Sequence, residues 1–276
     1  MIISVESKEI YGVALNKRKS EILLRSLIRE EINSRLVREA AQTQQEIQAQ
    51  VATLNLQPEI SSSVAAVKSL QGKIQLAAGI DGPTLGLLLA AAIAVSGRES
   101  TYGQGTRYQW TNWAESLMSQ YGVKDASIGP TQVKYGQNFG PGTDLAGYGQ
   151  QVGIAGPESL SEYPKAIMAT IGMLSKLYLK AKSLGYSTDK PGIASKSYSS
   201  TNNAALDLAL IGYNMGDAKV TNYCGTEAVK KPCAAGAKDV AVNYIPNFTD
   251  GGLSSLGYIA EVSKGISRFS AVIKLF

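Results

Sequence analysis

Apolar residues recur at helical spacing in the N-terminal part of the chain. Four of them step by four residues: Leu24, Ile28, Ile32 and Leu36. After a polar stretch the stripe resumes at Ile47, Val51 and Leu54. Side chains three or four apart share one helix face, so residues 16–54 are predicted to form one long amphipathic helix or a broken pair. Pro58 interrupts the pattern, and Ser61–Ser63 can cap a shorter helix after it.

Four further helices are predicted in the rest of the chain. The run LGLLLAAAIAVS at 85–96 carries no charge and follows Asp81-Gly82-Pro83, which is typical of a helix start. It is too short to cross a bilayer and is expected to be a core helix. Residues 165–184 and 204–216 have an apolar stripe at helical spacing. The terminal stripe comprises Ile259, Val262, Ile266, Phe269 and Ile273.

The remaining segments predict loops and a division of the chain. Residues 136–161 are dense in glycine, and residues 186–203 in Ser, Thr and Asn, so both are expected to be loops. Alternation typical of strands is scarce, which favours a mainly α fold. The composition changes near residue 75, and we expect an N-terminal helical arm at 1–75 and a domain at 76–276. Such a long polar helix needs tertiary cover, from its own domain or from a partner protein.

Composition excludes several kinds of chemistry. The 276 residues contain no histidine and two cysteines, which removes Ser–His–Asp and Cys–His catalysis and nearly every zinc site. We therefore expect no metal and no cofactor, with acid–base chemistry left to Asp, Glu, Lys and Tyr. Cys224 and Cys233 either form a local disulfide or remain two thiols. The net charge of +5 suits an anionic partner or serves solubility alone.

A glutamate follows directly after the apolar run, in the stretch GRES at 97–100. Burial disfavours the charged form of a carboxyl group and raises its pKa. Glu99 is therefore either a surface residue after a core helix or an acid that keeps its proton near neutral pH.

Four short stretches then occur in a fixed order: GRES, SIGPTQV at 127–133, ALIGYNMG at 209–216 and GYIAEV at 257–262. This order resembles the soluble lytic transglycosylase family and its goose-type lysozyme relatives. In that family a helix ends in Glu-Ser, a Gly-x-x-Gln loop follows, and then come an Ala-x-x-x-Tyr-Asn-x-Gly helix and a Tyr-[Val/Ile] pair. The resemblance covers about residues 85–270.

The resemblance implies a lysozyme-like helical domain that cleaves the β-1,4 bond between MurNAc and GlcNAc in peptidoglycan. Glu99 is then the catalytic acid, and afterwards the base that takes the proton of the 6-hydroxyl, giving 1,6-anhydro-MurNAc ends. The substrate-binding residues implied by position are Ser127, Gly129, Gln132, Tyr213, Asn214 and Tyr258. Gly129 is expected to let the backbone approach the sugar, and Gln132 to bind sugar or order its loop.

Some residues leave alternatives open. A goose-type hydrolase activates water with the help of an aspartate, for which Asp125 and Asp144 are candidates, although both are expected to be exposed loop residues. Where the family commonly has Gly-Leu-Met-Gln, this chain has Pro130 and Thr131 in the middle, so the family's apolar contact is in doubt. Trp110 and Trp113 either stack on sugar rings or pack in the core.

The expected location follows from the substrate and the N-terminus. No apolar signal segment precedes a cleavage site, so delivery to the cell wall needs another route. A phage virion provides one, with the arm bound to a tail or baseplate protein and the enzyme acting in the host periplasm. A cytoplasmic endolysin and a non-enzymatic virion structural protein are the alternatives. Neither nucleic acid nor a membrane span is expected.

Overall fold

The protein is mainly helical, as the sequence predicts. The computed structural model describes residues 43–101, 118, 126–183, 186, 201–216, 249–250 and 253–276. Of these residues, 73% are helical. The helical stripe predicted at 16–54 is described only from residue 43, where residues 43–52 form a helix with Ile47 and Val51 buried. The rest of that stripe lies outside the described residues.

The chain divides into two compact units, residues 1–50 and 51–276. The second unit includes α2 (Pro58–Ser69) and α3 (Gln71–Ala78), and the expected domain boundary at residue 75 falls inside α3. α2 packs against α8 (Tyr163–Ser183), and α3 packs against α7 (Ala146–Gln151). The apolar face of α2 is therefore covered within the unit itself.

α2 begins three residues earlier than the serine pattern predicts. Pro58 occupies the first turn, where its fixed φ and missing N–H are tolerated. The hydroxyls of Ser62 and Ser63 donate instead to the carbonyl of Glu59, at 2.8 and 3.0 Å. The prediction that these serines cap the helix was wrong, because they lie inside it.

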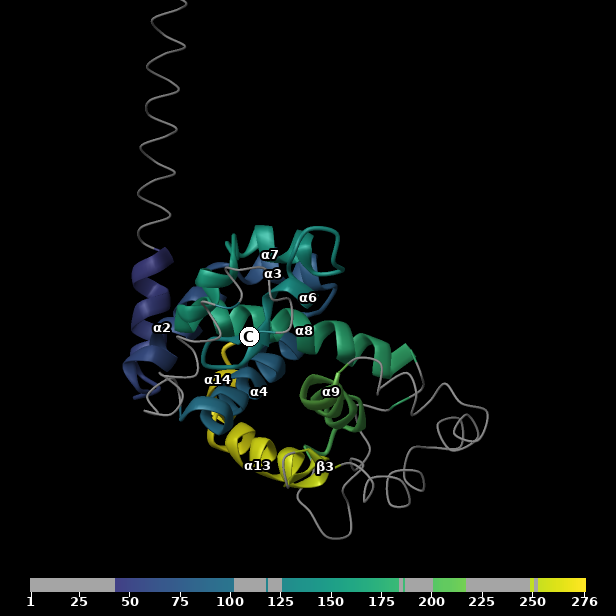
Figure 1. Ribbon diagram of the computed structural model, residues 1–276. Coiled ribbons are helices and arrows are strands. Elements are labelled where there is room, and N and C mark those ends of the chain that lie inside the picture. Colours follow the sequence, from purple (N-terminus) through teal and green to yellow (C-terminus); the bar gives the residue numbers. More distant parts are fainter. Residues whose placement is uncertain are drawn as a thin grey trace, which may run out of the picture. The chain divides into compact units, whose positions relative to one another are not determined.

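α4 (Gly82–Ser100) is the predicted core helix. The Asp81 side chain accepts a hydrogen bond of 2.8 Å from the backbone N–H of Thr84. Hydrogen bonds from the side chain and the backbone of Thr84 hold the pKa of Asp81 below its usual value. From Leu85 to Ser96 nearly every residue is buried, since α8, α13 (Ser255–Arg268) and α14 (Ser270–Ile273) pack around it (Figure 1). The helix ends at Thr101, which has φ +51°.

α8 and α9 (Ala204–Met215) pack against each other and fulfil the other two central predictions. The expected stripe of α8 is buried at Ile167, Ile171, Leu174 and Tyr178. α8 approaches α7 closely, because a Cβ on Gly172 would lie 2.6 Å from the ring of Tyr148. The side chain of Asn203 caps α9 by accepting from the N–H of Leu206 at 3.0 Å.

The C-terminal stripe is interrupted. α13 stops at Arg268, and α14 begins after Phe269. Ile259, Val262, Ile266 and Phe269 are buried as expected, but Val272 takes the buried position predicted for Ile273. The predicted stripe was therefore wrong at its last turn, which follows the break in the helix at Phe269.

The glycine-dense segment is more ordered than the loop predicted for it. It holds α6 (Tyr135–Asn138), α7 and the 3-10 helix η1 (Pro157–Ser161). Two small antiparallel hairpins complete the described elements. β1 (Ser127–Ile128) pairs with β2 (Val133–Lys134), with Ser127 opposite Lys134, and β3 (Thr249–Asp250) pairs with β4 (Leu253–Ser254).

Across the described ranges, no single helix has both the length and the apolar character needed to cross a membrane. By length and composition α3 and α4 together pass that test, with a bend of 95° between them.

Candidate functional site

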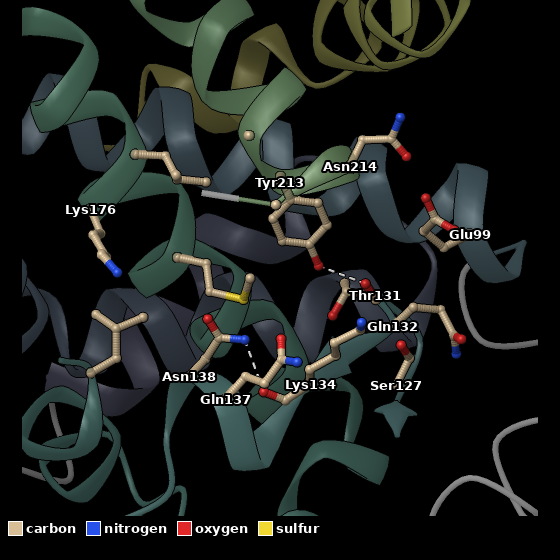
Figure 2. Close-up of a pocket in the computed structure, with 15 residues that line it drawn as sticks. Glu99, Ser127, Thr131, Gln132, Lys134, Gln137, Asn138, Lys176, Tyr213 and Asn214 are labelled. Carbon is tan, nitrogen blue, oxygen red and sulfur yellow. Dashed lines mark hydrogen bonds between the residues drawn. The ribbon is translucent and has the colours of Figure 1, made fainter. Parts of the chain in front are cut away.

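An open, polar cleft lies where the end of α4, the β1–β2 hairpin, α8 and the end of α9 meet (Figure 2). Its volume is about 820 Å³. Five residues expected from the sequence motifs line it: Glu99, Ser127, Gln132, Tyr213 and Asn214. Three motifs that are far apart in the sequence therefore meet at one surface.

Glu99 belongs to the last turn of α4, whose apolar body is buried among α8, α13 and α14. Its side chain is 21% exposed, and its Oε1 lies 3.1 Å from Nη1 of Arg98. Burial favours the neutral form of a carboxyl group, whereas a neighbouring guanidinium favours the charged form. The two effects oppose each other at Glu99, so its protonation near neutral pH stays a prediction.

The β1–β2 hairpin forms one wall of the cleft, and its turn requires Gly129. This residue has φ +81°, and a Cβ there would lie 2.0 Å from the carbonyl oxygen of Leu160 in η1. The close approach is therefore to the protein's own backbone, and Gly129 does not line the cleft among the described residues. The structure gives this glycine a packing reason, and its expected approach to the sugar stays a prediction.

Gln132 closes the same turn. Its backbone N–H and its side-chain Nε2 both donate to the carbonyl of Gly129, each at 3.0 Å. The residue adopts φ +56°, which is uncommon for a side chain larger than glycine. Of the two roles expected for Gln132, ordering the loop is supported by these bonds.

Tyr213 joins α9 to the hairpin. Its hydroxyl donates to the carbonyl oxygen of Thr131 at 2.6 Å (Figure 2). The same hydroxyl lies 3.4 Å from the hydroxyl of Thr170 in α8. Burial raises the pKa of Tyr213, and the charge of Glu99 raises it further. The hydroxyl therefore stays protonated and donates a hydrogen bond. Asn214 follows at the cleft edge, half-buried.

Tyr258 lies below the cleft, in α13. Its ring is buried, and the guanidinium carbon of Arg98 lies 4.5 Å from the ring centroid. Its hydroxyl is buried and makes no hydrogen bond of good geometry within the described ranges. Burial and the charge of Glu99 raise the pKa of Tyr258 well above its usual value. Tyr258 is thus packed beneath the Arg98–Glu99 pair and is absent from the described cleft lining.

Further polar residues line the cleft but belong to none of the sequence motifs. They come from β2, α6 and α8: Lys134, Gln137, Asn138 and Lys176. In Figure 2, Lys176 and Glu99 point into opposite ends of the cleft. On α8, Lys176 and Leu177 follow Met173 by three and four residues and line the cleft together with it, although Leu177 is buried.

The two candidate aspartates differ in what can be said of them. Asp144 is 76% exposed and forms an ion pair of 2.8 Å with Lys176, consistent with the exposed loop position expected for it. It is not among the described residues that line the cleft. Asp125, Trp110, Trp113, Cys224 and Cys233 lie outside the described residues. Within the described part of the chain, no three acidic or thiol side chains gather closely enough to share a metal ion.

Compared with known proteins, the chain matches no family model, no curated protein and no solved structure.

Proposed function

We propose that the cleft binds a peptidoglycan glycan strand and that Glu99 is the acid that cleaves its MurNAc-β-1,4-GlcNAc bond. One observation carries the proposal: residues from three separate motifs line one open cleft, and the tyrosine of the fourth stacks on Arg98, the ion-pair partner of the glutamate in that cleft. A cleft open to solvent suits a polymer, which must enter from the side. The helical domain around it is proposed to be lysozyme-like.

The proposed reaction begins at Glu99. The carboxyl group gives its proton to the glycosidic oxygen, which leaves with the GlcNAc side of the bond. The carboxylate then takes the proton of the MurNAc 6-hydroxyl as that oxygen bonds to C1, and a 1,6-anhydro ring results. No water is consumed, so a second carboxylate is not required. The engagement of Asp144 with Lys176 favours this route over a goose-type hydrolysis using Asp144.

The arm gives the protein its proposed setting. Of the arm expected at 1–75, residues 1–42 are proposed to bind a tail or baseplate protein of a phage particle. That particle would carry the enzyme to the host wall. The long apolar stripe of the N-terminal sequence supports this proposal, because such a stripe needs a covering surface. A virion structural protein without activity would have the same arm.

The first prediction tests the acid. Glu99→Gln is nearly isosteric and cannot donate the proton, so release of fragments from purified peptidoglycan should fall about 10²–10⁴-fold. Circular dichroism and the unfolding midpoint should not change. Glu162→Gln is the matched control, because Glu162 pairs with Lys165 at an exposed position and its loss changes the net charge equally. Retention of more than a few percent of activity in Glu99→Gln would place the acid elsewhere.

A further inference from the structure

The close packing of α4 and α13 creates a charged cluster beside Glu99. A Cβ on Gly265 of α13 would lie 2.5 Å from the Cβ of Ala94 in α4, so the two helices touch at this point. Arg98 lies one turn after Ala94, and Glu261 lies one turn before Gly265. Because the helices run in opposite directions here, these two side chains meet at the same end of the contact.

Arg98 is shared between two carboxylates. Its Nη1 lies 3.1 Å from Oε1 of Glu99, and its Nε lies 3.3 Å from Oε2 of Glu261. The same guanidinium stacks on the ring of Tyr258, at 4.5 Å from the centroid. Nε forms no hydrogen bond of good geometry within the described residues, so the contact with Glu261 is an ion pair rather than a directional bond.

The two carboxylates differ in exposure. Glu261 is 51% exposed and Glu99 is 21% exposed, so Glu261 is the better hydrated of the two. If Arg98 paired with Glu99 alone, its positive charge would favour the carboxylate form of Glu99, which cannot act as an acid. A second, more exposed carboxylate on the same guanidinium offsets that charge.

We propose that Glu261 is a positioning residue that shares Arg98 with Glu99 and so keeps the Glu99 carboxyl group able to give up and take back a proton. This inference rests on the proposed function of Glu99. Glu261 acts through Arg98 and does not itself line the described cleft. Arg98 also contacts Glu99 and the Tyr258 ring, so it should keep its position when Glu261 is replaced by glutamine.

Other charged and titratable groups surround Glu99 and enter any account of its titration. On α4, α13 and α9 these are Arg98, Glu261, Tyr258 and Tyr213. Across the cleft they are Lys134 of β2 and Lys176 of α8, the latter paired with Asp144. Both tyrosines remain protonated, and each substitution of Glu261 or Arg98 tested below changes one of these groups and leaves the others in place.

The test follows the Glu99 carboxyl carbon by NMR during a pH titration of the full chain labelled with ¹³C-glutamate, with its signal assigned by its absence in Glu99→Gln. In Glu261→Gln, the midpoint for Glu99 should move down by about 0.5–1 pH unit, because a negative charge paired with the same guanidinium is lost. In Arg98→Gln it should move up by about 1 unit or more. Glu162→Gln should leave it unchanged.

The alkaline limb of the peptidoglycan-cleavage profile should shift in the same directions as the NMR midpoint. An unchanged or raised Glu99 midpoint in Glu261→Gln, with the fold intact by circular dichroism, would overturn the sharing of Arg98. The NMR readout needs no activity. A protein that cleaves no peptidoglycan but shows the shift would refute the proposed function while retaining the coupling.

Discussion

At the scale of single residues, Tyr213 has a clearer role than the sequence alone suggests. From the sequence, the resemblance implies only that Tyr213 binds substrate. Its hydroxyl donates to Thr131, so it ties α9 to the hairpin that carries Ser127 and Gln132. Without that bond the Thr131 carbonyl loses its donor from α9, and the hairpin wall is held less firmly.

Tyr213→Phe should therefore lower the free energy of unfolding at pH 7 by about 1 kcal/mol, the usual net value of one hydrogen bond. The pKa of Tyr213 is raised in the folded protein, so above pH 10 the unfolded chain loses this proton first and stability falls as pH rises. Tyr213→Phe has no hydroxyl proton to lose at this position, so it lacks this loss of stability. Urea unfolding should show that the wild type exceeds Tyr213→Phe in free energy of unfolding by less at pH 10.5 than at pH 7.

A matched control is Tyr135→Phe, whose hydroxyl bonds the Ala155 carbonyl at an exposed site. It should cost about 0.5 kcal/mol at pH 7, toward the lower end for such bonds. If the difference in free energy of unfolding between wild type and Tyr213→Phe grew as the pH rose, the assignment of Tyr213 as a buried, neutral donor would be contradicted.

At the scale of elements, long periodic segments were predictable and short ones were not. α4, α8 and α9 follow from ten or more residues of consistent pattern and from start signals such as Asp81. α6 and α7 have four and six residues, too few to establish a period, and their glycines favour loops. Pro58 shows a further ambiguity, because proline both ends one segment and opens the next.

The candidate site divides in the same way. Glu99, Ser127, Gln132, Tyr213 and Asn214 belong to local motifs, and the described structure brings them to one cleft. Lys134 and Lys176 belong to no motif, because only the packing of α8 against β2 brings them there. The pairing of Arg98 with Glu261 likewise depends on the contact between α4 and α13, which no local pattern encodes.

That contact makes a prediction at the same scale. Gly265→Ala should lower the free energy of unfolding by about 1–3 kcal/mol, because the added methyl group overlaps Ala94 and forces α13 away from α4. The gain in helix propensity, up to about 1 kcal/mol, works in the opposite direction. Chemical denaturation measures the difference.

Gly72→Ala in α3 is the matched control, since nothing lies within 4 Å of a Cβ at that position. It should be neutral or slightly stabilising. If both alanine variants gained stability alike, the close approach of α4 and α13 would be refuted.

At the scale of the whole molecule, the packing of α2 fixes where the chain can be shortened. Ile60, Val64 and Val67 of α2 and Ile74 of α3 are buried. Burying one such side chain contributes about 1.5–3 kcal/mol, so four together approach the entire stability of an ordinary domain. These helices therefore belong to the domain energetically, although the sequence places them in the arm.

A chain that begins at Thr43 should accordingly fold, cleave peptidoglycan and fail to join the particle, because it lacks only the proposed docking segment. A chain that begins at Gly79 should unfold or aggregate. Thermal unfolding and fragment release compare the two, and particle association is read from assembled virions. A stable chain from Gly79 would contradict the packing account, and a chain from Thr43 found in particles would contradict docking through residues 1–42.

The central claim is that one carboxyl group, that of Glu99, cleaves the glycan strand without water. Mass spectrometry of the fragments released from purified peptidoglycan by the full chain tests it most directly. The proposed mechanism predicts fragments ending in 1,6-anhydro-MurNAc, absent from the Glu99→Gln digest and present in the Glu162→Gln digest. Fragments with mainly reducing ends would contradict it and indicate a goose-type hydrolase, with Asp125 and Asp144 the next residues to replace.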